Sequence, residues 1–112
     1  MTGDPRPELI ESLRALRELL TRHGVRYHPA TLISYEERLQ RNDRTAIASI
    51  ISDTTGSMGS LNDRIISYSN GDNLDGYPEA AINARLRLRI EQLRDQARAA
   101  RNTPWFRLTK SG

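Results

Sequence analysis

Leucines recur along the first part of the chain at intervals that place them on one side of a helix. They are separated by four, three and four residues, which is the period of an amphipathic helix. Asp4 precedes this run as a candidate N-cap, and Gly24 follows it as a candidate C-terminal glycine. The pattern predicts a helix over residues 5–23. The apolar positions are Leu9, Leu13, Leu16 and Leu20.

Two shorter apolar segments follow. His28 precedes Pro29, and a residue before proline is pushed away from helical geometry, so we expect residues 25–29 to be extended. A second helix then begins near Pro29 and ends at residues 40–42. Asp43 is a suitable N-cap for a third helix, although its β-branched residues also permit a strand. The apolar positions of the two segments are Leu32, Ile33, Tyr35 and Leu39, then Ala46, Ile47, Ile50 and Ile51.

Glycine and hydroxyl residues break the apolar pattern over residues 53–60. Ser60 and Asp63 have the spacing of a capping box, which predicts a short fourth helix of about two turns. Two Asx-Gly dipeptides then indicate a polar loop over residues 70–78.

The longest predicted helix covers residues 79–101. Its apolar residues repeat every three or four positions, with most arginines off that stripe. Residues 102–112 form a C-terminal extension that contains Trp105 and Phe106, which a disordered tail would not be expected to concentrate. The apolar stripe consists of Ile82, Leu86, Ile90, Leu93, Ala97 and Ala100.

These elements predict an all-α fold. We expect residues 1–112 to form a single helical domain, a small bundle of about five helices with its core at about residues 5–101. A Gly/Ser-rich loop precedes the short fourth helix in this fold. No apolar stretch approaches the roughly 20 residues needed to span a bilayer, so we expect a cytoplasmic protein without membrane contact.

Charge is distributed unevenly along the chain. The net charge is +3, but residues 79–112 contribute +5 and residues 53–78 contribute −3. Opposite charges at two sites favour binding to a protein partner or to a second copy of the chain. All basic residues except Lys110 are arginines, whose planar forks suit carboxylates and protein interfaces as well as phosphates.

Several chemistries lack their usual residues. The chain has no cysteine, which excludes disulfides, thiolate nucleophiles and cysteine-ligated metals. His23 and His28 are not at a helical ligand spacing, so we interpret them as surface or loop-capping residues and predict no metal. Ser57 and Ser60 lack the order of a nucleophile elbow. We therefore predict a protein without catalytic residues or cofactors.

The glycine-rich and acidic segments lack residues that an anion site or a calcium site needs. Backbone N–H groups of residues 56–60 could face an anion, but no basic residue lies between Asp53 and Asp63, and the lysine of a P-loop is missing. In the acidic loop, Gly71 stands where a calcium-binding loop needs its first oxygen ligand. A helix-entry turn and a solvated turn are the preferred interpretations.

The run Gly56-Ser57-Met58-Gly59-Ser60-Leu61-Asn62-Asp63 resembles the Gly-Met-Gly-Ser-(Leu/Phe)-Asn-Asp core of a family of short, uncharacterised bacterial helical proteins. The resemblance would extend over about residues 9–100, with specificity confined to this core. Ser57 replaces a second glycine, and Arg64 replaces an apolar residue. The resemblance implies an all-helical cytosolic protein with no known catalytic residues, of an immunity-like kind associated with secreted toxins.

Two functional hypotheses follow. The first is a non-catalytic, immunity-type inhibitor that binds a bacterial toxin through its acidic segment, with apolar side chains as anchors. Its candidate partner-binding residues are Asp53, Ser57, Met58, Asp63, Tyr68, Asp72, Asp75 and Tyr77. The alternative is a small basic protein that binds nucleic acid through its last long helix. Its candidate residues are Arg85, Arg87, Arg89, Arg94, Arg98 and Arg101. The sequence leaves a homodimer open.

Overall fold

The chain folds as a small all-α bundle, as the sequence predicts. The computed structural model describes residues 4–24, 27–55, 76 and 78–108, and these residues form helices and connections without a strand. The helices are α1 (Arg6–Arg22), α2 (Tyr27–Gln40), α3 (Thr45–Thr55), α4 (Glu79–Ala100) and α5 (Pro104–Leu108). The short helix predicted after Ser60 lies outside the described residues.

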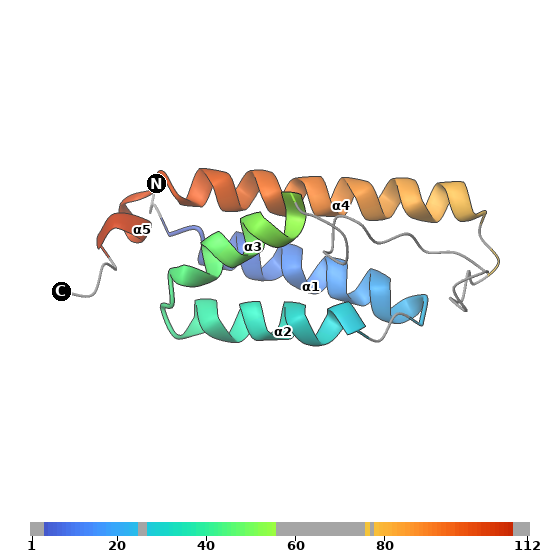
Figure 1. The fold of residues 1–112 in the computed structure, drawn as a ribbon, viewed down its shortest axis with the longest axis horizontal. Helices are drawn as coiled ribbons and strands as arrows, with labels where there is room; N and C mark the ends of the chain where they lie inside the picture. The colour runs from blue at the N-terminus through green and yellow to red at the C-terminus, as the bar shows by residue number, and fades with distance from the viewer. Residues whose placement is uncertain (1–3, 25–26, 56–75, 77, 109–112) are drawn as a thin grey trace.

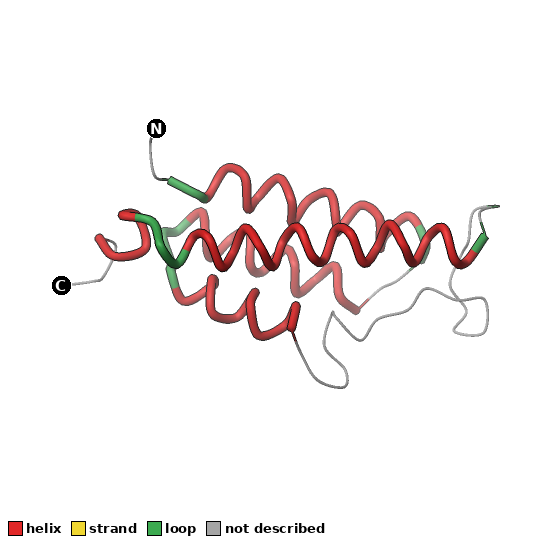
Figure 2. The backbone as a smooth tube through the Cα atoms, turned by 90° about the horizontal axis from the view of Figure 1, so that it is seen from above, coloured by secondary structure: helices red, strands yellow, loops and turns green. Residues whose placement is uncertain are grey.

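The four longer helices run up, down, up and down (Figure 1). α1 packs against α2 and α4, while α3 packs against α4 and, over a smaller contact, α2. α3 has 11 residues and α4 has 22, so α3 accompanies only part of α4 (Figure 2). Among the described residues, no helix has the length and apolar character needed to cross a membrane.

The ends of α1 lie close to their predicted positions. The Asp4 carboxylate accepts a hydrogen bond from the Arg6 backbone N–H at 3.0 Å, which satisfies one donor of the first turn. Gly24 has φ +79°, and its N–H donates to the Thr21 carbonyl at 3.1 Å. A side chain is strained in this left-handed region, so glycine ends the helix here at low cost.

The prediction of an extended segment before Pro29 is wrong at His28. α2 begins at Tyr27, so His28 and Pro29 belong to its first turn. Proline is tolerated there because the first N–H groups of a helix have no acceptor within the helix. The apolar face is also narrower than predicted, because Ile33 is 41% exposed.

The turn from α2 to α3 is stabilised by both its backbone and its side chains. Asn42 adopts φ +63°, while the Asp43 N–H donates to the Arg38 carbonyl at 2.8 Å, as in a Schellman motif. The Asp43 carboxylate accepts the Thr45 backbone N–H at 3.0 Å and caps α3 as predicted. The third segment is therefore helical, and the strand alternative is excluded.

The core is built from the predicted apolar stripes. The four leucines predicted to face the core from α1 are fully buried, and all six apolar positions predicted for the long helix are buried on α4. α2 contributes Leu32, Tyr35 and Leu39, and α3 contributes Ala46, Ile47 and Ile50. One apolar stripe from each helix therefore meets at the centre of the bundle.

The C-terminal extension folds back onto the bundle as α5. Trp105 and Phe106 are half-buried and pack against the core. The Arg6 guanidinium lies over the Trp105 ring, 5.8 Å from its centroid, and Arg44 lies 5.6 Å from the Phe106 centroid. Arg44 also donates to the Phe106 carbonyl at 3.2 Å. α5 thus joins the starts of α1 and α3 at one end of the bundle.

Candidate functional site

Of the eight residues predicted to bind a partner, the structure describes Asp53. It lies in the last turn of α3, half-buried, and accepts a hydrogen bond from the Tyr35 hydroxyl at 3.0 Å. Burial and the Asp53 carboxylate raise the pKa of Tyr35. Asp53 therefore links α3 to α2. The other predicted residues, Ser57, Met58, Asp63, Tyr68, Asp72, Asp75 and Tyr77, lie outside the described residues.

The arginines predicted to bind nucleic acid do not share one environment. Arg94 is half-buried, and its guanidinium donates to the Thr54 carbonyl at 3.0 Å near the end of α3. This contact uses the side chain inside the bundle, where it satisfies a carbonyl without a helical partner. The other five arginines are exposed, namely Arg85, Arg87, Arg89, Arg98 and Arg101.

The exposed arginines lie on two flanks of α4. At about 100° per residue, Arg85 and Arg89 fall on the flank toward α1, whereas Arg87 and Arg98 fall on the opposite flank. The line between the flanks carries Leu88, which is 57% exposed, together with alanine and acidic residues. A phosphate backbone is contacted best by a continuous basic stripe. The number of arginines favours nucleic-acid binding, but their division between two flanks is less suited to it.

Several carboxylates of the bundle form internal ion pairs. Glu36 is 6% exposed, and its two oxygens accept from Arg14 at 3.1 Å and from Arg17 at 3.0 Å. Asp43 pairs with Arg38 at 3.1 Å, which joins the end of α2 to the start of α3. The sequence pattern did not reveal these pairs, because they depend on which helices become neighbours.

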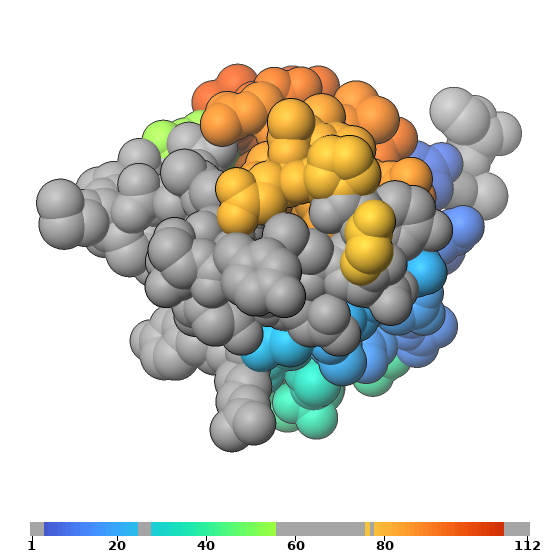
Figure 3. Space-filling view, turned by 90° about the vertical axis from the view of Figure 1, so that its right-hand side faces the viewer, coloured from blue at the N-terminus to red at the C-terminus, as the bar shows by residue number. Residues whose placement is uncertain are grey.

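A hollow lies at the end of the bundle opposite α5, where α1 ends and α4 begins. Figure 3 looks onto this end, where the first residues of α4 (gold) lie across from the last residues of α1 (blue). The hollow contains about 280 Å³ of empty space counted out to its open mouth. Its lining residues are Leu19, Arg22, His23, Ala81, Ile82 and Arg85.

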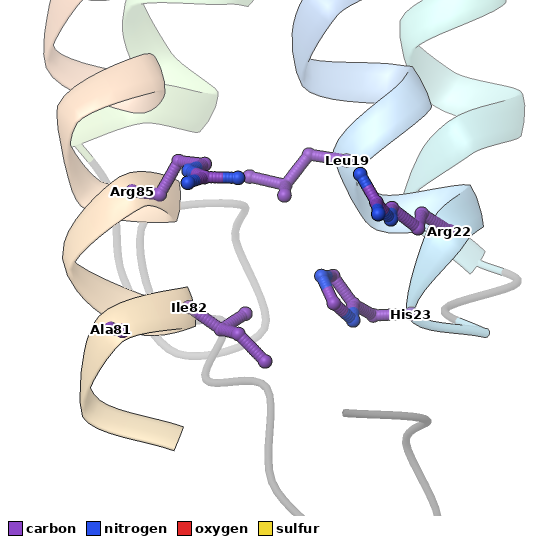
Figure 4. A pocket seen from close by; sticks show the side chains of 6 residues that line it. All are labelled: Leu19, Arg22, His23, Ala81, Ile82 and Arg85. Carbon is purple, nitrogen blue, oxygen red and sulfur yellow. The ribbon is translucent and has the colours of Figure 1, made fainter. Parts of the chain in front are cut away.

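The side chains of the hollow come from both helices and face one another. Figure 4 shows Arg22 at the end of α1 and His23, which follows it, opposite Ile82 and Arg85 of α4. Two interpretations of His23 were open, a surface residue or a capping residue. His23 is 3% exposed, so the surface interpretation is wrong at this position. It is the C-cap residue of α1, and its imidazole lies toward α4 (Figure 4).

No sequence pattern predicts this site, because the residues from its two helices are about 60 positions apart. Local signals were present in part: Gly24 fixes the end of α1, and Ile82 fixes the buried side of α4. The missing information was that these two helix ends meet. Among the described residues, no group of three His, Asp or Glu side chains could hold a metal ion.

Comparisons of the chain with protein-family models, with curated proteins and with solved structures find no match.

Proposed function

We propose that the chain is a non-catalytic protein-binding module, which acts in the bacterial cytoplasm as an immunity-type inhibitor of a toxin. Inhibition by direct binding needs a complementary surface on a rigid scaffold and no catalytic group. The proposed surface is the acidic segment between α3 and α4, which includes Asp63, Asp72 and Asp75.

The observation that supports the proposal is the concentration of negative charge in one segment of the chain. Residues 53–78 contain four aspartates and one arginine, whereas α1 contains three glutamates and four arginines. The described carboxylates of Glu36 and Asp43 are held in ion pairs within the bundle. A concentrated negative charge next to packed helices suits a partner with a basic binding surface.

The bundle supports this role by fixing the two ends of the segment. α3 ends at Thr55, where Arg94 binds the Thr54 carbonyl, and α4 begins at Glu79. Both helices pack against each other, so the two attachment points have a defined separation. The ordering cost of binding is smaller when the ends of a loop are fixed in advance.

Capture of the partner is the first step of the test. The tagged chain would be added to nuclease-treated native cytosol, and a protein bound at one-to-one stoichiometry would be identified. That protein would then be expressed in a heterologous host. The proposal expects it to stop growth when expressed by itself and to become harmless when co-expressed with the chain.

A triple variant then tests the acidic segment. Asp63→Asn, Asp72→Asn and Asp75→Asn together should abolish protection, with helical content unchanged. The matched control replaces three exposed glutamates, Glu11, Glu18 and Glu37, by glutamine, which changes the net charge equally. This control should still protect. A non-toxic partner, or full protection by the aspartate variant, would contradict the proposal.

The alternative function is nucleic-acid binding by α4, supported by its four exposed arginines and by Arg101, which directly follows the helix. It predicts an affinity that falls steeply with salt, because bound phosphates release counterions. Replacing Arg87 and Arg98 by glutamine should then reduce the slope of log K against log salt by about 1.8. Weak binding without that slope would exclude this alternative.

A further inference from the structure

We propose that the hollow between α1 and α4 binds a carboxylate carried on a short apolar stem. The proposal is independent of the inhibitor function, which uses a different part of the chain and the opposite charge. It rests on the side chains that line the hollow, on their charge and on the size of the space.

Two guanidinium groups from different helices supply the charge. Arg22 lies in the last turn of α1 and Arg85 in the second turn of α4, and both side chains reach into the same hollow (Figure 4). Among the described residues, Arg85 has no hydrogen-bond or ion-pair partner, whereas Arg94 of the same helix is bonded inside the bundle. A planar guanidinium matches a planar carboxylate with two parallel hydrogen bonds.

The remaining walls set the shape of the ligand. Leu19, Ala81 and Ile82 are apolar, and they lie beside the arginines in the same hollow. The space of about 280 Å³ includes the open mouth of the hollow, so a ligand would be covered on one side and remain partly exposed to solvent. The hollow therefore suits a small ligand, with a short apolar stem beside these walls and a carboxylate facing the two guanidinium groups.

The buried imidazole adds a polar group to the inner wall. His23 is 3% exposed, and its ring faces the hollow across from Ile82 (Figure 4). Its backbone N–H bonds to the carbonyls of Leu19 and Leu20, which fixes where the side chain starts, and burial leaves the ring little room to move. A group held in this way orients a ligand at little entropic cost.

The carboxylate that binds in the hollow can belong to a free carboxylic acid or to the acidic side chain of another protein. The chain labelled with ¹⁵N and ¹³C would be titrated with isovalerate and with N-acetyl-glutamate N-methylamide. Isoamyl alcohol, the glutamine analogue and inorganic phosphate serve as comparison probes. We expect saturable shifts at Ala81, Ile82 and the Arg85 side chain with one or both carboxylates. The acid that binds more tightly identifies the source.

The variants separate this site from general attraction to a basic protein. Arg85→Gln should weaken carboxylate binding by about tenfold or more, because it removes a charge-assisted pair. Arg22→Gln should have a similar effect. Arg87→Gln removes the same charge from the same helix outside the hollow, and should leave binding unchanged.

Three results would overturn the inference. One is a set of shifts that does not saturate with either carboxylate. Another is equal binding of isovalerate, isoamyl alcohol and phosphate. The third is equal weakening by Arg85→Gln and Arg87→Gln, with both variants folded by circular dichroism.

Discussion

Glu36 is a buried charge that two arginines hold between α1 and α2. Its side chain is 7% exposed, while the side chains of Arg14 and Arg17 are 55% and 31% exposed. Each arginine therefore retains contact with water when the pair breaks, but the carboxylate does not. The cost of breaking the pair falls mainly on Glu36, because an unpaired buried charge is strongly unfavourable.

Removing both arginines should thus cost more than the sum of the single changes. We expect Arg14→Ala or Arg17→Ala alone to be tolerated, since the other arginine still binds Glu36. The double variant should lower the free energy of unfolding by about 3–5 kcal/mol, measured by urea denaturation.

A third substitution checks this explanation. Glu36→Met in the double variant removes the buried charge and fills a similar volume with apolar atoms, so it should restore much of the lost stability. If stability did not recover, the loss would come from packing by the arginine stems.

Tyr35 gives the bundle a sensitivity to alkaline pH. Burial and the nearby Asp53 carboxylate raise the pKa of its hydroxyl, so the folded state retains the proton at a pH where the unfolded chain releases it. The contribution is fully present below the unfolded pKa of about 10 and is lost as the pH rises toward the folded pKa.

The test is a comparison of the chain with Tyr35→Phe between pH 8 and pH 11. The variant should be less stable by about 1 kcal/mol near pH 8, because the hydrogen bond to Asp53 is lost. Above pH 10, the stability of the unmodified chain should fall more steeply, by up to about 1.4 kcal/mol per pH unit. Parallel curves for the two proteins would contradict this role of Tyr35.

At the scale of the elements, α3 depends on its cap. It is an 11-residue helix, too short to be stable in isolation, and Asp43 satisfies the backbone N–H of Thr45. Hydrogen bonding from the Thr45 side chain and from Arg38 lowers the pKa of the Asp43 carboxyl. The cap therefore stabilises the fold above the unfolded pKa of Asp, about 3.9, and weakens as the pH falls through the folded value.

Asp43→Ala should lower the free energy of unfolding by about 0.5–2 kcal/mol at pH 7. The difference from the unmodified chain should shrink as the pH is lowered from 7 toward 2, because the carboxyl group takes up a proton as the pH falls through its folded-state pKa. Asp95→Ala, an exposed acid on α4, is the matched control and should change stability by less than about 0.5 kcal/mol. A difference that stays constant from pH 7 to pH 2 would show that the charge of Asp43 does not matter.

Local sequence signals predict where the helices begin and end, but they do not predict which helices contact each other. α1 and α4 begin and end within a residue or so of the expected positions, because periodicity, Asp4 and Gly24 act over a few residues. His28 was assigned wrongly because the rule for residues before proline is weaker in the first turn of a helix. The Glu36 pairs and the hollow were not predictable, since they join side chains that meet only after the bundle assembles.

At the scale of the whole molecule, α5 ties the end of the chain to the starts of two other helices. Trp105 and Phe106 lie beneath Arg6 and Arg44, so the docking of α5 requires that α1 and α3 are already in place. α5 should unfold together with the bundle. The single tryptophan makes this measurable, because its fluorescence reports on α5 by itself.

Urea unfolding followed by Trp105 fluorescence and by circular dichroism at 222 nm should give the same midpoint. Arg44→Ala removes the hydrogen bond to Phe106 and a cation–π contact. The free energy of unfolding reported by fluorescence should therefore fall by about 1–2 kcal/mol, which moves the fluorescence midpoint to a lower urea concentration. Arg41→Ala, an exposed arginine in the same turn, should leave the transitions together. Separate midpoints in the unmodified chain would contradict the docking of α5.

The distance between α5 and the hollow has a practical consequence. The starts of α1 and α5 lie at the same end of a molecule 49 Å long, and the end of α1 and the start of α4 lie at the other (Figure 1). The hollow is lined by residues from these last two helix ends. A fluorophore or a surface anchor attached to the start of α1 or to α5 is therefore far from Arg22 and Arg85. In surface plasmon resonance, such an anchor keeps the chip surface away from the hollow, so the chip itself does not block the entry of ligands.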